Sequence, residues 1–176
     1  MEFRTKVELP IGECEIRHDS LIMSWGSCFA DNISRKLIEN KFSCDANPFG
    51  VLYNPLSVAQ SLQTLLHERY YTENDLQYAN GQWFSLMHHG SFSSADKDEC
   101  LNGINERIRL GAANLRKARI AIITWGTARV YEWSADGSIV GNCHKLPEKM
   151  FRRRLLDVDE IVEKYVSLIS EILNCN

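Results

Sequence analysis

The chain lacks any uninterrupted apolar run near the ~18 residues that a helix needs to span a bilayer. Its first ten residues contain Glu2, Arg4, Lys6 and Glu8, which interrupt the apolar centre that a secretion signal requires. Both absences favour a cytoplasmic protein that does not associate with membranes.

An excess of charge of one sign is also missing. The 20 Lys and Arg residues face 23 Asp and Glu residues, which leaves a net charge of −3. This balance gives no electrostatic argument for nucleic acid as a partner. The one basic cluster, Arg152-Arg153-Arg154, is short, and we interpret it as a solvated approach to a helix.

The six cysteines contain no C-x-x-C pair. Without a secretion signal, they are typical of reduced and mostly buried thiols, so we expect no disulfide framework. No Cys or His residues have the spacing of zinc ligands, apart from the adjacent His88 and His89. We therefore expect neither a metal nor another cofactor.

A length of 176 residues suits one domain, here residues 1–176, with 44% hydrophobic and 24% charged residues as in ordinary soluble proteins. Arg4–Leu9 alternates and ends at Pro10, which suits an edge strand or an extended arm. A strand, helix, strand and helix then follow within about fifty residues and predict a βαβ-type sheet. Their expected positions are 21–24, 29–40, 41–46 and 55–68, with Asn54 as the cap of the second helix.

The second half adds two hairpins and two helices. Asn80-Gly81 and Asp136-Gly137 are strong turn signals between short strand patterns. Helices are expected over 95–117 and 158–173, the second with Ile161, Tyr165, Ile169 and Ile172 on its buried face. Arg119–Thr124 has the composition of the most buried strand. The whole pattern predicts an α/β domain with hairpin insertions.

Three small-residue turns follow predicted strands: Gly26-Ser27, Pro48-Phe49-Gly50 and Gly126-Thr127. In parallel sheets the carboxyl ends of strands share one edge, where ligands bind. A serine in a glycine turn between a strand and a helix is also how a nucleophile is held, since the helix start offers unpaired N–H groups. The three turns together indicate a site at this edge.

The residues Gly26-Ser27-Cys28-Phe29-Ala30 spell the motif that names the GSCFA family. The resemblance continues through 47–50, 53–55, 88–89, 124–127 and 142–147, which is nearly the whole chain. The GSCFA family resembles the SGNH/GDSL hydrolases, serine esterases on a flavodoxin-like three-layer α/β/α sheet. The resemblance implies hydrolysis of acyl esters, with small-molecule or carbohydrate esters as substrates.

Carried over by position, Ser27 is the implied nucleophile and the Gly50 N–H an implied donor to the oxyanion. The third block departs from the usual Gly-x-Asn-Asp, because this chain has Gly126-Thr127-Ala128-Arg129. Either Thr127 or Asn142 is then the candidate for the third donor.

The general base of SGNH hydrolases lies in a late Asp-x-x-His block, and this chain contains no such block. Family members continue through further strands, so the sequence resembles the N-terminal portion of a GSCFA domain. Strand 119–124 would then be an edge strand and a pairing risk, which suggests a homodimer through the exposed sheet edge. His144 and His89 are the remaining candidates for the base, although a loop histidine is more often structural.

Two alternatives stay open. Cys28 could act as a thiolate at a helix start, against the simpler interpretation as a small buried residue. The chain could also be a non-catalytic module that binds a carbohydrate or acylated ligand through aromatic rings near the hairpins. The candidate rings are Trp83, Phe84, Trp125, Tyr131 and Trp133, although rings of this kind more often fill a core.

Overall fold

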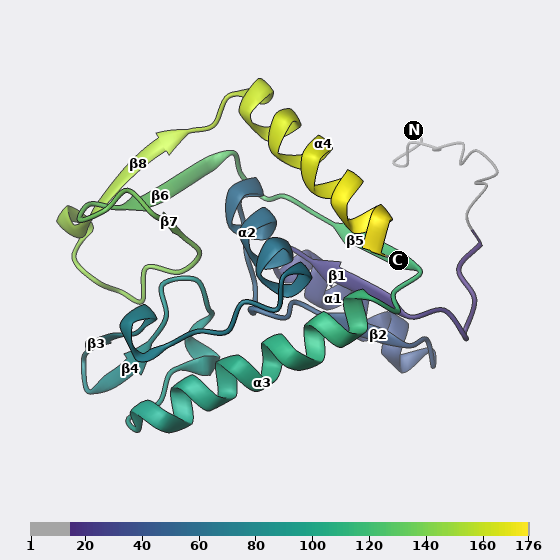
Figure 1. The fold of residues 1–176 in the computed structure, drawn as a ribbon, viewed down its shortest axis with the longest axis horizontal. Helices are drawn as coiled ribbons and strands as arrows, with labels where there is room; N and C mark the ends of the chain where they lie inside the picture. Colours follow the sequence, from purple (N-terminus) through teal and green to yellow (C-terminus); the bar gives the residue numbers. More distant parts are fainter. Residues whose placement is uncertain (1–14, 176) are drawn as a thin grey trace, which may run out of the picture.

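A computed structural model describes residues 15–175 (Figure 1), so the predicted extended segment Arg4–Leu9 lies outside the described residues. Its central feature is a parallel sheet in the order β2-β1-β5. The strands are β2 (Cys44–Ala46), β1 (Ile22–Trp25) and β5 (Ile120–Ile123). Ile22 of β1 lies opposite Cys44 on one side and Ile120 on the other. β1 has a neighbouring strand on both sides, and all four of its residues are buried.

Helices cover both faces of β1. Ser24 points to α1 (Cys28–Glu39), where its hydroxyl lies 2.6 Å from that of Ser34. Met23 and Trp25 point to the opposite face, because neighbouring residues of a strand alternate. There they join the main core cluster with α2 (Pro55–Leu66), α3 (Lys97–Leu115) and α4 (Val158–Cys175).

Among these helices, α2 lies between α3 and α4 (Figure 1). The start of α2 agrees with the predicted cap, whereas α3 begins at Lys97 rather than at residue 95. Asn54 caps α2 through a hydrogen bond from the Ser57 N–H, and Asp96 caps α3 through one from the Glu99 N–H, both at 2.8 Å. The prediction of a mixed α/β fold is confirmed, whereas a flavodoxin-like three-layer arrangement stays a prediction.

Both predicted hairpins are present. β3 (Gln77–Ala79) and β4 (Gln82–Phe84) pair around Asn80-Gly81, whose φ angles of 53° and 78° suit a tight hairpin turn. The second hairpin belongs to an antiparallel sheet in the order β7-β6-β8, with strands β6 (Arg129–Trp133), β7 (Ile139–Val140) and β8 (Phe151–Leu155). Three short 3₁₀ helices among the described residues are η1 (Glu73–Asp75), η2 (Gly90–Phe92) and η3 (Glu148–Met150).

The interpretation of Arg152-Arg153-Arg154 as a solvated helix approach was wrong, because these residues form the middle of β8. The buried carboxylate of Glu132 on β6 accepts hydrogen bonds from Arg152 and Arg154 across the two strands. Arg154 also donates two hydrogen bonds of 2.7 Å to Glu160 at the start of α4. Paired charges across the strands therefore stabilise β8, although the composition of this segment alone does not predict a strand.

Two burial predictions were also wrong. Within residues 15–175, β5 has a partner strand on one side only, and its residues are at most half-buried, so β1 is the more buried strand. On α4, Leu168 is buried, whereas Ile169 is 47% exposed. Ile169 instead belongs to a second apolar row along the outside of the helix, which comprises Val158, Val162, Val166, Ile169 and Leu173.

The open side of β5 and this outer apolar row of α4 bear on self-association. An unpaired strand edge is a template for another strand, and contiguous exposed apolar side chains mark interaction surfaces. A homodimer through this edge stays a prediction.

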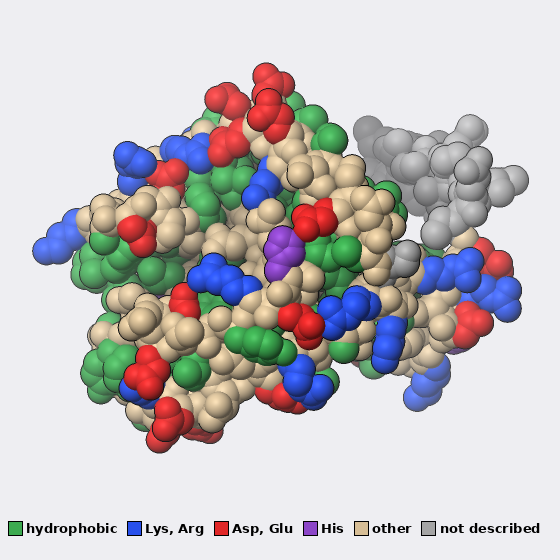
Figure 2. Space-filling view, in the orientation of Figure 1, with side chains coloured by type: hydrophobic (Ala, Val, Ile, Leu, Met, Phe, Trp, Pro, Cys, Tyr) green, Lys and Arg blue, Asp and Glu red, His purple; other side chains and the backbone are tan. Residues whose placement is uncertain are grey.

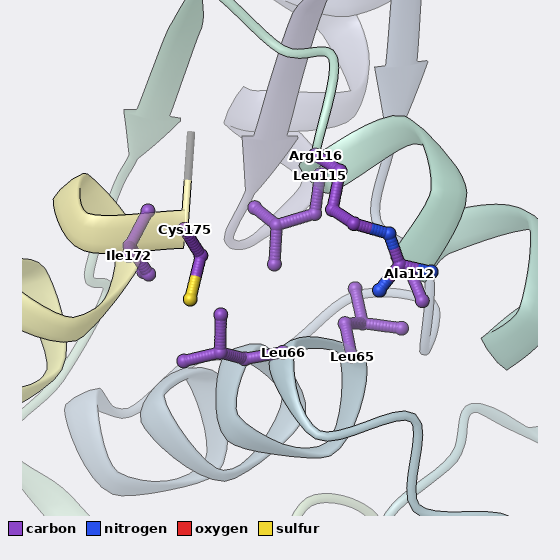
Figure 3. A pocket seen from close by; sticks show the side chains of 7 residues that line it. All are labelled: Leu65, Leu66, Ala112, Leu115, Arg116, Ile172 and Cys175. Atoms are coloured by element: carbon purple, nitrogen blue, oxygen red, sulfur yellow. The ribbon is translucent and has the colours of Figure 1, made fainter.

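An apolar cavity of about 230 Å³ also lies between the ends of α2, α3 and α4 (Figure 3). Its lining includes Leu66, Leu115 and Ile172.

Charges of both signs are mixed over the face in Figure 2, and acidic side chains gather over the start of α4. In the part of the chain that the structure describes, no helix combines the length and apolar composition needed to cross a membrane. Cytoplasmic localisation stays a prediction.

Asp45 on β2 allows a test of how α3 is fastened to the sheet. Its carboxylate pairs with Arg107 and accepts a 2.7 Å hydrogen bond from Asn114, and both partners lie on α3. Because Asp45→Asn leaves a largely buried guanidinium without its counter-charge, we expect a loss of about 2 kcal/mol in the free energy of unfolding. Urea denaturation measures this loss.

Glu106→Gln is the matched control, since Glu106 forms an exposed ion pair with Arg109 on the same helix. Its urea midpoint should stay at the wild-type value. Equal midpoints for the two variants would show that the Asp45 pairs do not fasten α3.

Candidate active site

The three small-residue turns meet at one edge of the parallel sheet. Gly26 follows β1, Asn47–Gly50 follows β2, and Trp125–Thr127 follows β5. Because the three strands are parallel, their carboxyl ends share this edge. The predicted convergence of the turns is therefore a feature of the fold.

The side chain of Asn47 joins the first two turns. Its Oδ1 accepts a 2.8 Å hydrogen bond from the Gly26 N–H, and its Nδ2 donates to Asp31 in the first turn of α1. Its backbone bonds to the Ser24 carbonyl and the Gly50 N–H at 2.8 and 2.7 Å. Asn47 has a φ of 43°, a left-handed conformation that Asn tolerates better than most residues.

Gly26 brings the third turn against the first. Its φ is 148°, and a Cβ at this position would lie 2.0 Å from Thr124 Oγ1 and 2.6 Å from the Thr124 carbonyl oxygen. Only glycine permits so close an approach between these two backbones. The turn that carries Ser27 is thus fixed by Asn47 on one side and by Thr124 on the other.

Ser27 is the N-cap of α1 and is half-buried. Its Oγ accepts a long hydrogen bond of 3.3 Å from the Phe29 N–H. Its own N–H has no partner among residues 15–175 and lies at the positive end of the helix dipole. Ser27 therefore combines a hydroxyl held by one weak contact with a free donor suited to a developing oxyanion.

Gly50 makes different contacts from those predicted. Its N–H donates to the Asn47 carbonyl at 2.7 Å, so it is not free for an oxyanion in this conformation. Its φ is 78°, and a Cβ would lie 2.2 Å from the Cβ of His89. Gly50 thus allows the segment that contains His89 to pack against the second turn.

The two candidates for the third donor each have hydrogen bonds of their own. The N–H groups of Gly126 and Thr127 donate to the Tyr53 carbonyl at 2.9 and 3.1 Å, and Thr127 Oγ1 accepts from the Arg129 N–H at 3.0 Å. Asn142 Oδ1 accepts from the His144 N–H at 2.9 Å. Neither Thr127 nor Asn142 has a hydrogen bond with Ser27 within residues 15–175.

The two histidine candidates do not contact Ser27 Oγ through any hydrogen bond among the described residues. His144 Nε2 lies 2.9 and 3.0 Å from the carbonyl oxygens of Ser85 and His88, and its ring stacks on Phe84. An Nε2 between two carbonyls must carry the proton. Burial lowers the pKa of His144, which favours the neutral ring. His89 Nδ1 accepts from the Ser91 N–H at 3.2 Å and caps η2.

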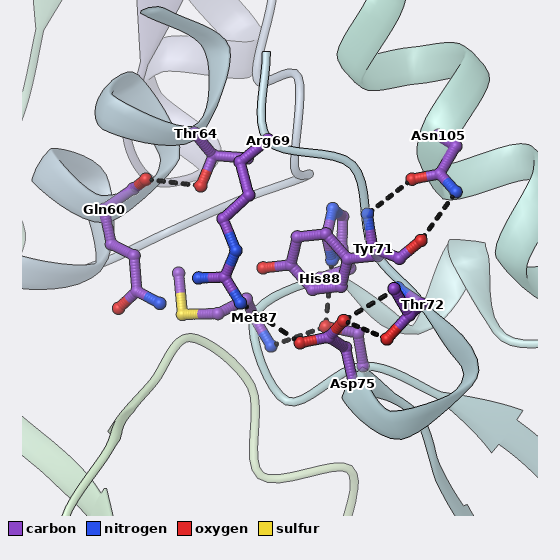
Figure 4. Close-up of polar contacts among 10 residues, drawn as sticks. Gln60, Thr64, Arg69, Tyr71, Thr72, Asp75, Met87, His88 and Asn105 are labelled. Carbon is purple, nitrogen blue, oxygen red and sulfur yellow. Dashed lines mark hydrogen bonds and ion pairs between the residues drawn. The ribbon is translucent and has the colours of Figure 1, made fainter. Parts of the chain in front are cut away.

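His88, which was predicted only as part of a pair, is the most enclosed histidine (Figure 4). Its ring stacks on Phe49 at 4.1 Å and meets Tyr71 edge-on at 4.9 Å, while its Nδ1 lies 3.0 Å from Ser85 Oγ. Its buried Nε2 has no partner among the described residues. Burial, with a smaller effect of His144, lowers the pKa of His88 to about 3.

Cys28 corrects another prediction. It is exposed at the first position of α1, so the interpretation as a small buried residue was wrong. Cys175 is exposed as well, and only Cys100 of the described cysteines is fully buried. Cys28 therefore stays an accessible alternative nucleophile beside Ser27.

The five candidate aromatic rings do not form a single surface. Trp83 packs on Tyr78, Phe84 lies buried under His144, and Trp125 meets Tyr165 on α4. Tyr131 and Trp133 both contact Phe151 on β8. Each ring thus has its own local partner, and 48% exposed Trp125 is the most accessible of the five.

These features define an α/β protein with a serine at the start of the helix that follows its central strand. Residues 21–176 match the model of the GSCFA family, and the chain belongs to this family. No curated protein and no solved structure matches the chain.

The role of Gly50 in packing can be tested against an equivalent glycine in open space. Gly50 and Gly81 have the same φ of 78°, but no atom lies within 4 Å of a Cβ built on Gly81. We expect Gly81→Ala to lower the free energy of unfolding by about 1 kcal/mol through backbone strain alone. Gly50→Ala should lose about 3 kcal/mol or more, because His89 must also move. Similar urea midpoints for the two variants would contradict a close approach at Gly50.

The enclosed His88 predicts a pH dependence of stability. The unfolded chain binds a proton near pH 6.5, whereas folded His88 does so near pH 3, so the unfolded state binds more protons between these values. The folded state should lose about 2 kcal/mol from this group between pH 7 and pH 5.

The measurement is urea denaturation at both pH values for the wild type and for His88→Phe, which keeps a ring against Phe49 without a titrating group. The variant should show a smaller loss on acidification, and the difference isolates His88 from the carboxylates. The same loss in both proteins would mean that His88 titrates normally in the fold.

Proposed function

We propose that the turn Gly26-Ser27-Cys28 is the nucleophile site of an SGNH/GDSL-like serine esterase that hydrolyses acyl esters, including those of carbohydrates. The flavodoxin-like α/β/α layering of that class belongs to the same proposal. The observation that carries it is the placement of Ser27. The residue lies between the carboxyl end of the central parallel strand and the start of α1, and its N–H has no partner in the part of the chain that the structure describes.

Two further observations support Ser27 as the reacting residue. The turn is held from both sides, by the Asn47 side chain and by the contact of Gly26 with Thr124, which gives the hydroxyl a fixed position. Only the 3.3 Å contact with the Phe29 N–H has to be given up when the hydroxyl attacks.

In the proposed reaction, Ser27 Oγ attacks the ester carbonyl carbon while its proton passes to a base. The carbonyl electron pair moves to the oxygen, and the resulting oxyanion accepts a hydrogen bond from the Ser27 N–H at the helix start. Collapse of this intermediate expels the alcohol, which takes up the proton. Water then releases the acid from the acyl-serine by the reverse sequence.

The proton acceptor limits this reaction. No histidine or carboxylate is hydrogen-bonded to Ser27 Oγ within residues 15–175, and His144 is committed to two backbone carbonyls. Loss of one triad member leaves about 10³–10⁴-fold catalysis over water in serine hydrolases. We therefore expect slow acylation of Ser27 in the 176-residue chain.

The second candidate function is a non-catalytic module that binds an acylated or carbohydrate ligand. The missing contact between Ser27 and a base favours it. In that case the turn would position a ligand, and Ser27 would show no more reactivity than an ordinary surface serine.

A fluorophosphonate probe tests the proposal, because it phosphonylates activated serines. We expect slow labelling, mapped to Ser27 by peptide mass spectrometry. Added imidazole should accelerate the labelling several-fold, because it supplies the missing proton acceptor. The label should be lost in Ser27→Asn, a variant that keeps an acceptor oxygen for the helix cap.

Cys28→Ala is the matched control at the adjacent position, and its labelling should equal that of the wild type. Labelling that survives in Ser27→Asn but disappears in Cys28→Ala would transfer the reaction to the thiol. The absence of any labelling, with or without imidazole, would leave the binding module as the function.

A further inference from the structure

A second hollow lies away from Ser27, between the β3–β4 hairpin, the segment around η2 and the loop 142–145. Its volume is about 420 Å³, and we call it the Lys145 pocket. Ser27 and the other residues of its turn are not among the lining residues. His89 lines the pocket and also packs against Gly50 of the candidate active site.

The loop that forms one wall holds an unusual conformation. His144 and Lys145 are consecutive non-glycine residues with positive φ angles of 48° and 58°. The hydrogen bonds from His144 Nε2 to the carbonyls of Ser85 and His88, together with stacking on Phe84, hold the loop in place. Strain of this kind persists only where the surroundings fix it, and it clusters at ligand sites.

For three polar side chains that line the pocket, the existing contacts determine which group is left to bind a ligand. In each case this group is a hydrogen-bond donor. Asn142 Oδ1 is occupied by the His144 N–H, so its Nδ2 is the group left over. His89 Nδ1 accepts from the Ser91 N–H, so in the neutral ring Nε2 carries the proton. The Lys145 ammonium has neither an ion pair nor a hydrogen bond within residues 15–175.

Within residues 15–175, no carboxylate lines the Lys145 pocket. Its remaining polar side chains include the amides of Asn80 and Gln82, which have no side-chain hydrogen bond among the described residues. An unpaired cation, two fixed donors and no acidic group together favour a negatively charged oxygen ligand. The volume exceeds that of a bare ion and leaves room for a body the size of a monosaccharide.

We propose that the Lys145 pocket binds a sugar-sized ligand that carries an oxyanion, either a carboxylate or a phosphate monoester. Lys145 Nζ, Asn142 Nδ2 and His89 Nε2 hold the charged group, and the amides of Asn80 and Gln82 contact its hydroxyl groups. Binding in this pocket does not depend on the reactivity of Ser27. The proposal can therefore be tested separately from the proposed esterase.

The experiment titrates the full chain with glucuronate, glucose 6-phosphate and neutral glucose at low salt, and follows the side-chain amide signals of Asn142 and Gln82 by NMR. We expect saturable shifts with at least one of the two anionic sugars and much weaker shifts with glucose. The stronger of the two anionic probes identifies the charged group. Lys145→Gln should weaken its binding about tenfold or more, because it removes a charge-assisted hydrogen bond.

Lys149→Gln is the matched control, since Lys149 is an exposed lysine of η3 and does not line the pocket. Its affinity should stay within about twofold of the wild type, because a screened surface charge contributes little. Thermal unfolding of both variants at the wild-type midpoint establishes that they fold. Equal affinity for glucose and the anionic sugars, an equal loss in both variants, or no saturable shift with any probe would each overturn the proposal.

Discussion

The candidate site depends on the hydrogen bonds of one amide side chain. Asn47 follows β2, yet its Oδ1 fixes the Gly26 N–H after β1 and its Nδ2 reaches Asp31 on α1. Neither an aspartate nor a leucine could accept from one neighbour and donate to the other at once. Parallel strands bring the turns to the same edge, but this bidentate contact sets their spacing. The position of Ser27 is therefore specified by a residue twenty positions further along the chain.

The backbone donors at this edge are mostly committed. The N–H groups of Gly50, Gly126 and Thr127 all end on carbonyl oxygens of neighbouring turns, which makes the edge rigid. The Ser27 N–H, in contrast, has no hydrogen-bond partner within residues 15–175. A site built in this way offers a fixed nucleophile with a free donor at its own N–H, and it leaves the proton acceptor as the part that decides between an enzyme and a binding module.

Local signals predicted the elements well and their surroundings poorly. The cap Asn54 and the turns at Asn80-Gly81 and Asp136-Gly137 act through contacts within a few residues, so sequence was sufficient. The strand at Arg152–Arg154 depends on Glu132 twenty positions away, and the exposure of Ile169 depends on which helix lies opposite. The family motif pointed to Ser27. The engagement of Gly50 and the role of Asn47 required knowing how the turns meet, because hydrogen-bond partners of a loop are set by tertiary contacts.

The outer apolar row of α4 has an energetic meaning beyond its geometry. Full burial of a Val, Leu or Ile side chain stabilises a protein by roughly 1.5–3 kcal/mol, and the five side chains of this row are each about half or more exposed. Helix α4 thus retains several kcal/mol of hydrophobic free energy that the folding of residues 15–175 does not use. Whatever covers this row gains a driving force comparable to the whole stability of a small domain, which lies at about 5–15 kcal/mol. Helix α4 is thus folded while its outer apolar row stays uncovered within residues 15–175.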